Sequence, residues 1–409
     1  MDSRCIVIRF IRIAESKARL VLALFCILQI VILPYRAAAW SIEAHSAIAN
    51  AAIQLLPSPW RQFFGFYTGL LAETATYPDI YYRESDPNES PRHFIDLEIW
   101  NPNDPSTGTL PQAVEEFTGE MESAIRAKDW NSMFIDAGRI SHYMADVTQP
   151  YHTTVNYNPQ TRNGVGAHQL FESTSLAHLS EIRMVGSADV RPIIPISNVT
   201  DFVIETAVQS HSFLSSINRT IIDEGLDWTP ELTKILENRT NTAIIASARI
   251  WYTAVVRSNS PPPELPKVNE LSIVVESIAL NSTDYGVIKL HVTDALGVKT
   301  RANVSLSADG STFRGQAANT VPPLGEYVIA VPSAAYNANL VVTAQKEGYK
   351  PATVTIAASA STPTSSTPLT NIPYSTTVGL TVMAAALLAL VWYRRKVKHD
   401  DYLSSTQWS

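Results

Sequence analysis

The stretch 142-HYMADVTQPYH-152 combines helical spacing with an abrupt end to the helix. His142 and Asp146 are four residues apart, so on a helix their side chains lie on one face, one turn apart. Pro150 disfavours helical conformation at Gln149 and lacks a backbone donor, so the helix should end there. The chain can then turn so that His152 points back toward the same face. The pattern therefore predicts three ligand-type side chains gathered at the end of one helix.

Further histidines and carboxylates lie on both sides of this stretch. "HQLFE" places His168 and Glu172 four residues apart on the next predicted helix, while "YPDIYY" supplies Asp79 and "PRHFID" supplies His93. Imidazole nitrogens and carboxylate oxygens are the usual nitrogen and oxygen ligands of zinc. Two helical pairs together with loop ligands can surround a small metal cluster inside a helical bundle. Because each pair alone is a common surface feature, the ordered series as a whole carries this prediction.

The pattern of apolar residues divides the chain into two folded regions. Residues 40–257 carry apolar residues at three- and four-residue spacing in segments separated by proline, glycine and asparagine, which predicts an all-α domain. The segment 258–266, "SNSPPPELP", is a stiff proline-rich linker. Residues 267–357 form short runs of valine, isoleucine and threonine between turns, which predicts a β-sandwich. This module resembles immunoglobulin-like or prealbumin-like modules, and we expect a spacer or adhesion role that hydrolysis of a soluble substrate does not need.

Both ends of the chain have the composition of targeting segments. Residues 1–39 have a basic start, an apolar run and a final "AAA", which is typical of a signal peptide cleaved after Ala39. Residues 358–375 are a Ser/Thr/Pro stalk, residues 376–393 are predicted to form one transmembrane helix, and the basic segment within 394–409 predicts a cytoplasmic tail. The expected location is the cell membrane, in a single-pass protein anchored by its C-terminal helix, with the catalytic domain outside.

Composition and charge exclude several classes of site. The chain has 409 residues, a formal net charge of −7 and no basic tract in its middle, so non-specific electrostatic binding to nucleic acid is not favoured. Its two cysteines, Cys5 and Cys26, both precede the predicted cleavage site. The processed chain would therefore have no disulfide and no cysteine ligand for a metal.

The full series resembles one known superfamily. Trp–x₄–His at residues 40–45, followed by Asp, His, His–x₃–Asp–x₅–His and His–x₃–Glu, resembles the zinc-dependent phospholipase C and S1/P1 nuclease superfamily over roughly residues 40–257. The resemblance implies an all-α multi-helix catalytic domain of that type, here followed by the small all-β sandwich and the transmembrane helix. It also implies that the newly exposed Trp40 binds zinc through its free α-amino nitrogen and its carbonyl oxygen.

The resemblance further implies a three-zinc centre and a division of its ligands. The first zinc would bind Asp79, His93, His142 and Asp146, the second His152, His168 and Glu172, and the third Trp40 and His45, with Asp146 bridging the third zinc to the first. Zinc ions so placed clamp a phosphate ester and make hydroxide available near neutral pH. Asp79 is also expected to orient or deprotonate the attacking water.

Three functional hypotheses follow. The final pair, His168 with Glu172, resembles the phospholipases, because the nucleases usually end in Asp; this favours phospholipase C-type hydrolysis of phospholipid phosphate esters. The close spacing of Trp40 and His45 resembles instead the S1/P1-type nucleases and 3′-nucleotidases, whose substrates are nucleic acids or nucleotides. The third hypothesis is a cell-surface binding protein with structural metals. The full three-metal ligand set argues against it, since a structural site needs only one closed zinc.

Overall fold

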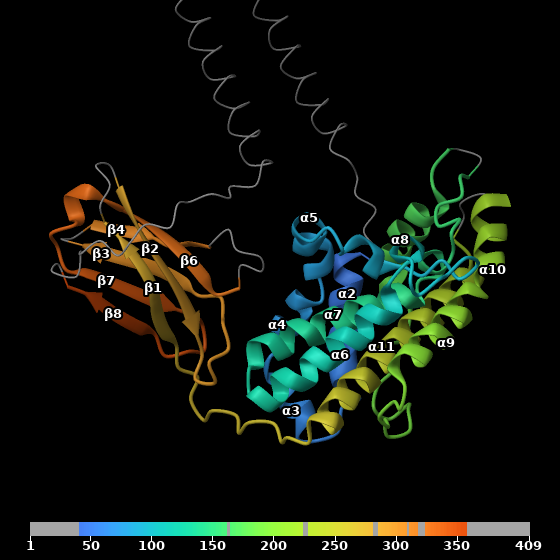
Figure 1. The fold of residues 1–409 in the computed structure, drawn as a ribbon, viewed down its shortest axis with the longest axis horizontal. Helices are drawn as coiled ribbons and strands as arrows, with labels where there is room; N and C mark the ends of the chain where they lie inside the picture. The colour runs from blue at the N-terminus through green and yellow to red at the C-terminus, as the bar shows by residue number, and fades with distance from the viewer. Residues whose placement is uncertain are drawn as a thin grey trace, which may run out of the picture.

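The computed structural model describes residues 41–161, 164–223, 228–280, 285–308, 311–317 and 324–357. The predicted signal peptide 1–39, Trp40, the stalk, the predicted transmembrane segment 376–393 and the tail lie outside the described residues. The described chain forms a helical domain followed by a small antiparallel β domain, which confirms the predicted combination of an all-α and an all-β region (Figure 1).

The helical domain runs from residue 42 to residue 258. Its elements in chain order are α2 (Ile42–Ile53), α3 (Trp60–Phe66), α4 (Thr68–Thr74), η1 (Pro78–Tyr82), α5 (Arg83–Ser85), η2 (Ser90–His93), η3 (Pro105–Thr107), α6 (Leu110–Ala127), α7 (Trp130–Thr148), η4 (Pro150–Thr153), α8 (Ala167–His178), η5 (Leu179–Glu181), α9 (Val199–His211), α10 (Leu214–Asn218), η6 (Arg219–Asp223) and α11 (Pro230–Ser258). Helices α2, α4, α6, α9 and α11 pack around α7.

Helix α7 is central because its sequence is apolar or small on several faces. Phe134, Ile140, Tyr143 and Met144 are each fully buried, and each such side chain stabilises the fold by about 1.5–3 kcal/mol relative to an exposed position. The helix ends at Thr148, and Gln149 is extended (φ −82°, ψ 115°), as the following proline predicts. The end of α7 that carries His142 and Asp146 is thereby fixed inside the bundle.

A close approach between α4 and α7 positions the segment that follows α4. Gly138 of α7 lies so close to α4 that a Cβ atom there would be 2.4 Å from Thr74 Oγ1. The Thr74 hydroxyl also donates to the Phe134 carbonyl at 3.0 Å. Since only glycine permits this contact, the chain leaves α4 directly beside α7, and η1 follows within a few residues.

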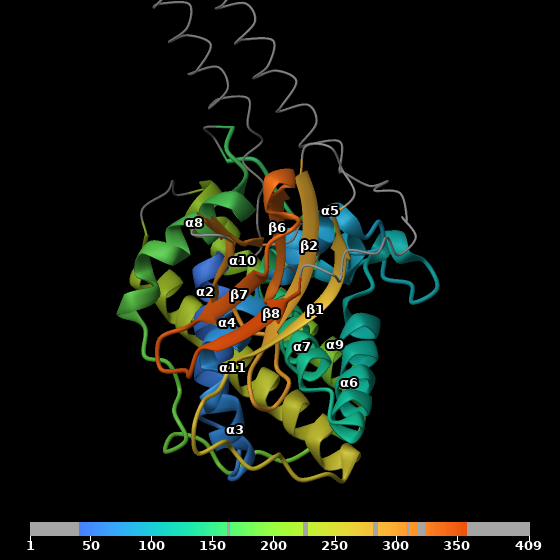
Figure 2. The same ribbon diagram turned by 90° about the vertical axis from the view of Figure 1, so that its left-hand side faces the viewer.

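The β domain is built from two antiparallel sheets that share one core. The first has the strand order β1-β2-β6-β5 and the second β4-β3-β7-β8. The strands are β1 (Ser272–Ala279), β2 (Tyr285–Thr293), β3 (Asn303–Ala308), β4 (Ser311–Arg314), β5 (Gln316–Ala317), β6 (Glu326–Pro332), β7 (Leu340–Gln345) and β8 (Ala352–Ile356). Ile288 and Ile329 of the first sheet pack with Leu306 and Val342 of the second, and Figure 2 shows the β domain in front of the helices. The immunoglobulin-like assignment stays a prediction.

The predicted single-pass location at the cell membrane needs correction. A membrane-spanning helix needs about 20 predominantly apolar residues, and none of the helices in the described ranges meets the length and hydropathy that a span requires. The single-pass prediction rested on residues 376–393, which those ranges do not include.

Candidate metal centre

Three elements bring four of the predicted ligands together. Asp79 comes from η1, His93 from the end of η2, and His142 with Asp146 from α7. His93 Nδ1 lies 2.9 Å from Asp146 Oδ2 and 3.2 Å from His142 Nε2. Asp79 Oδ1 lies 3.8 Å from His93 Nδ1, and its Oδ2 lies 3.9 Å from His142 Nε2. The ligand atoms of His93, His142 and Asp146 all lie within 4.8 Å of one another, which is close enough to hold one metal ion.

A second group is formed by His152 of η4 together with His168 and Glu172 of α8. His168 Nε2 is 2.6 Å from Glu172 Oε1, and His152 Nε2 is 3.5 Å from the same oxygen. These three residues are buried, and their ligand atoms again lie within 4.8 Å of one another. His152 Nδ1 is 4.0 Å from Asp146 Oδ1, so the second group adjoins the first.

His45, in the first turn of α2, adjoins the first group. Ser41 caps this helix by accepting a hydrogen bond from the Ala44 amide, which fixes the start of α2. The His45 ring stacks on that of His142, with ring centroids 3.9 Å apart, and its Nε2 lies 3.7 Å from Asp146 Oδ1. His45, Asp79 and His142 form a third group of suitable size. All eight predicted ligand residues within the described chain therefore lie in one cluster, and Trp40 is not among the described residues.

Backbone contacts select the nitrogen that each of two histidines presents. His142 Nδ1 lies 2.8 Å from the Ala75 carbonyl oxygen, and His152 Nδ1 lies 2.5 Å from the His93 carbonyl oxygen. A carbonyl oxygen can only accept, so each Nδ1 carries the proton and donates it. Each Nε2 is then left with its lone pair facing the cluster, which is the arrangement that outer contacts impose on metal-binding histidines.

The polar atoms of the cluster fit a metal centre better than a closed hydrogen-bond network. Seven of these buried atoms have no hydrogen-bond partner among the described residues: both ring nitrogens of His45, both carboxylate oxygens of Asp79, Nε2 of His93, Oδ1 of Asp146 and Nε2 of His152. Two of them, Asp79 Oδ1 and His93 Nε2, lie within ion-pair distance of a residue beside the cluster. Buried polar groups in folded proteins are normally paired, and each unpaired one costs about 1–3 kcal/mol. Metal coordination would use these nitrogen and oxygen atoms.

Burial sets the protonation of the cluster. It lowers the pKa of His45 to about 3 and the pKa values of His93 and His142 well below their usual range, so these rings are neutral and able to bind a metal. Burial raises the pKa of Asp79 to about 6, although the Arg83 guanidinium acts in the opposite direction.

The pKa of Glu172 is lowered, whereas that of Asp79 is raised, because the histidines beside Glu172 have a larger effect than its burial. Burial alone would raise the pKa of this carboxyl, but His168 and His152 lower it to about 2. The second group therefore holds one ionised carboxylate between two imidazoles. Ionised carboxylate and imidazole are both ligand types that zinc prefers.

Several residues beside the cluster escaped the sequence analysis. Arg83 Nε lies 2.8 Å from Asp79 Oδ1, and Glu89, which is fully buried, places Oε1 3.3 Å from His93 Nε2. Each stands four residues from its partner, which is the same spacing that identified the helical ligand pairs. Gln149 donates from Nε2 to Glu172 Oε1 at 2.9 Å and is recognisable in sequence only by its place before Pro150.

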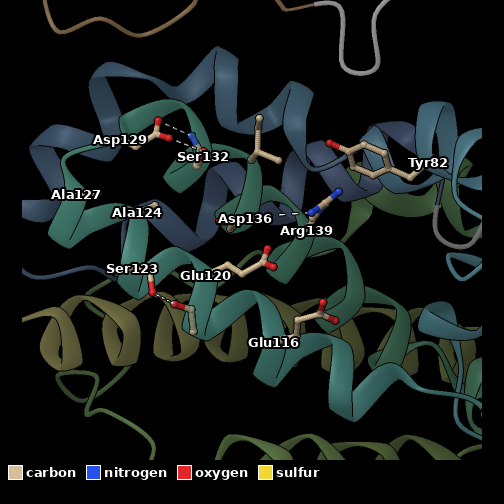
Figure 3. A pocket seen from close by; sticks show the side chains of 12 residues that line it. Tyr82, Glu116, Glu120, Ser123, Ala124, Ala127, Asp129, Ser132, Asp136 and Arg139 are labelled. Atoms are coloured by element: carbon tan, nitrogen blue, oxygen red, sulfur yellow. Dashed lines mark hydrogen bonds and ion pairs between the residues drawn. The ribbon is translucent and has the colours of Figure 1, made fainter.

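A separate cleft of about 770 Å³ lies between α6 and α7 (Figure 3). Glu116, Glu120 and Asp136 line it together with Arg139, whose guanidinium lies 4.1 Å from the ring centroid of Tyr82. Burial and the neighbouring Glu120 raise the pKa of Asp136 to about 8. Among the described residues that line this cleft, none is a predicted metal ligand, so the cleft is distinct from the candidate centre.

Comparisons with known proteins give distant likenesses only. No family model matches the chain, and no curated protein matches it. Among solved structures, the alpha-toxin of Clostridium perfringens from avian strain SWCP is similar with a TM-score of 0.41 and 14% identity, over 77% of this chain and 92% of that one. The alpha toxin of Clostridium absonum is similar with a TM-score of 0.41 and 13% identity, over 76% of this chain and 91% of that one. Likeness at this level leaves the activity to be inferred from the chain's own residues.

Proposed function

We propose that the helical domain is a zinc-dependent phosphoesterase, and that its reaction is phospholipase C-type hydrolysis of a phospholipid phosphate ester. The supporting observation is the cluster of His45, Asp79, His93, His142, Asp146, His152, His168 and Glu172, in which seven buried nitrogen and oxygen atoms lack a hydrogen-bond partner in the described chain. A purely structural zinc needs four ligands in one closed site. A cluster of eight ligand residues exceeds that need and favours catalysis.

The proposed division of ligands keeps the three groups that the sequence resemblance implies. Asp79, His93, His142 and Asp146 would hold the first ion, His152, His168 and Glu172 the second, and Trp40 with His45 the third, with Asp146 shared between the third and the first. When bound, zinc supplies Lewis-acid polarisation of a phosphoryl oxygen and lowers the pKa of water.

Asp79 and Arg83 have proposed roles of their own in the reaction. The Asp79 side chain is 7% exposed and Arg83 lies within ion-pair distance, so the carboxylate is held in one orientation at the cluster. We infer that it orients the attacking water and accepts its proton. The Arg83 side chain, 26% exposed, adds positive charge beside the cluster and would favour an anionic ester.

Exposed apolar side chains close to the ligand residues in sequence support an amphiphilic substrate. Ile80, beside Asp79, is 40% exposed, and Val155, three residues after His152, is 49% exposed. The ring centroid of Tyr157, whose side chain is 61% exposed, lies 6.3 Å from that of His168. Exposed apolar groups near a polar site are typical of surfaces that bind a partly apolar ligand.

An activity panel tests the proposal. The protein, expressed from the full-length coding sequence and supplied with zinc, is incubated separately with phosphatidylcholine vesicles, single-stranded DNA and a 3′-nucleotide. We expect release of diacylglycerol, abolished in His142→Ala and retained in His291→Ala, which alters a histidine of the β domain. Cleavage of nucleic acid or nucleotide without diacylglycerol release would replace this function with that of a nuclease or 3′-nucleotidase. Absence of hydrolysis on all three substrates would favour a binding protein with structural metals.

A further inference from the structure

The β domain is attached to the helical domain through the loop between β2 and β3. Val298 in this loop is 1% exposed and packs in the core of the helical domain. The Tyr67 hydroxyl donates to Asp294 Oδ2 at 2.7 Å, and both residues are buried. Asn131, in the first turn of α7, donates from Nδ2 to the Gly297 carbonyl at 2.9 Å and accepts from the Lys299 amide at 2.6 Å. The loop is therefore fixed to the helices by both apolar and polar contacts.

The same loop continues into an ion pair with α4. Arg301 donates from Nε to both Glu73 oxygens at 3.1 Å, and from Nη2 to Glu73 Oε1 at 2.6 Å. Glu73 Oε1 also accepts from the Tyr77 hydroxyl at 2.8 Å. One carboxylate thus joins a guanidinium of the β domain to a tyrosine of the helical domain.

Tyr77 is placed to transmit this contact to the candidate metal centre. Its side chain is fully buried, and it directly precedes η1, whose second residue is Asp79. Its ring packs edge-on against those of Tyr81 and Tyr82 in η1, with centroids 5.1 and 6.2 Å away. A single π-helical turn such as η1 is rare and short, so contacts of its side chains strongly influence where it lies.

We propose that the β domain helps to place Asp79 in the metal centre through the series Arg301–Glu73–Tyr77, so that Arg301 and Glu73 are positioning residues for metal binding. This inference rests on the metal centre of the proposed function. It differs from the sequence-based expectation of a mere spacer, because it assigns the β domain a role in the geometry of the site. Residues beyond the direct ligands commonly set metal affinity when they fix a ligand's orientation.

Cobalt binding to the purified full-length protein tests the series without relying on activity. Co²⁺ reports coordination through its visible absorption spectrum, and competition with a chelator gives its affinity. The variants are Arg301→Ala, Tyr77→Phe and the double variant. Lys350→Ala is the matched control, because it removes another exposed ion pair of the β domain, Lys350 with Glu270 at 2.7 Å. Glu73→Gln is a further variant, since its amide oxygen can still accept from Tyr77 while the charge facing Arg301 is lost.

The series predicts losses of Co²⁺ affinity that differ in size between the variants and do not add up in the double variant. Arg301→Ala should weaken Co²⁺ affinity by up to about fivefold, which corresponds to the upper range for a partly exposed ion pair, and should alter the Co²⁺ spectrum. Tyr77→Phe should weaken it by about tenfold, the lower end of the range for residues that contact a ligand segment. The double variant should lose no more than about twofold beyond Tyr77→Phe, Glu73→Gln should lie near Arg301→Ala, and Lys350→Ala should match the unaltered protein.

Three outcomes would overturn the inference, and they are distinguishable. If the unaltered protein binds Co²⁺ and Arg301→Ala changes only the melting temperature, leaving affinity and spectrum unchanged, Arg301 merely attaches the β domain. Full additivity of the two losses would likewise show that Arg301 and Tyr77 act separately. If the unaltered protein fails to bind Co²⁺ at all, the metal centre itself is wrong and both proposals fall.

Discussion

Removal of metal should destabilise the helical domain strongly, because the candidate centre buries polar atoms that metal ions would satisfy. The perturbation is exhaustive treatment with a chelator, followed by re-addition of zinc. Seven nitrogen and oxygen atoms of the cluster are buried without a hydrogen-bond partner in the described chain, and five of these also lack an ion-pair contact with Arg83 or Glu89. At about 1–3 kcal/mol each, the gross cost of these five atoms is roughly 5–15 kcal/mol, which is comparable to the entire stability of a typical domain.

The stability gained on adding zinc depends on the free zinc concentration relative to the Kd of each site. At a free zinc concentration about a thousandfold above Kd, each bound ion stabilises the folded state by about 4 kcal/mol. For a domain of this size, about 1 kcal/mol shifts the melting temperature by about 2–4 °C. One recovered site should therefore raise the melting temperature by roughly 8–16 °C, and several sites by more.

Differential scanning calorimetry of the chelated and zinc-loaded protein measures this shift. His142→Ala should lose most of the response, because it removes a ligand at the centre of the cluster, where its ring contacts those of His45 and His93. His291→Ala is the control, since His291 lies in the β domain and pairs with Glu276 at 2.8 Å. Equal melting temperatures with and without zinc, or an undiminished response in His142→Ala, would refute the assignment of this cluster as a metal centre.

Three further predictions concern other residues. Burial raises the pKa of Asp136 from 3.8 to about 8, so the stability contributed by this group is complete below about pH 4 and is lost as the pH rises through about 8. The free energy of unfolding of Asp136→Asn, measured by urea denaturation, should therefore rise relative to that of the unaltered protein by about 2–3 kcal/mol as the pH goes from about 5 to about 7. A difference between the two proteins that does not change with pH would contradict this. Gln149→Ala should weaken zinc affinity by about 10–100-fold, because Gln149 orients Glu172, and chelator competition would show an unchanged Kd if that role were absent. Extra residues left ahead of Trp40 should lower zinc content and turnover, because they convert its α-amine into an amide. Trp40→Ala with a free N-terminus should retain more zinc and more turnover than the extended protein. Equal zinc content in the native and extended proteins would exclude the α-amine of Trp40 as a ligand.

The placement of the proposed ligand pairs on their helices was predictable because their spacing is local. The positions of His142 and Asp146 depend only on the helical repeat, and Pro150 accounts for the end of α7 before His152. The change from three- and four-residue spacing to short alternating runs likewise predicted a helical domain followed by a β domain. These features need no knowledge of which segments pack together.

The surroundings of the ligands depend on packing between distant segments, which a single sequence does not reveal. The Ala75 and His93 carbonyls orient His142 and His152 through backbone atoms, so no side-chain pattern marks them. His211 donates from Nδ1 to the Thr153 carbonyl at 2.9 Å and thus supports the loop of His152, a contact that no local spacing in the sequence marks. The attachment of the β domain through Asp294 and Arg301 joins residues more than 200 positions apart.

The balance of charge in the proposed centre agrees with an anionic substrate even though the chain as a whole is acidic. The cluster contains three carboxylates, those of Asp79, Asp146 and Glu172, beside imidazole rings and the Arg83 guanidinium. Three divalent ions would outweigh the charge of three carboxylates, so the loaded centre would be strongly positive while the formal charge of the chain is −7. Field lines from such a centre, surrounded by buried apolar residues, are poorly screened. An anionic phosphate ester would then be drawn to the cluster rather than to the remaining surface. Without metal, burial raises the pKa values of Asp79 and Asp146 and favours their neutral forms, while Glu172 stays ionised, so the cluster offers no such attraction.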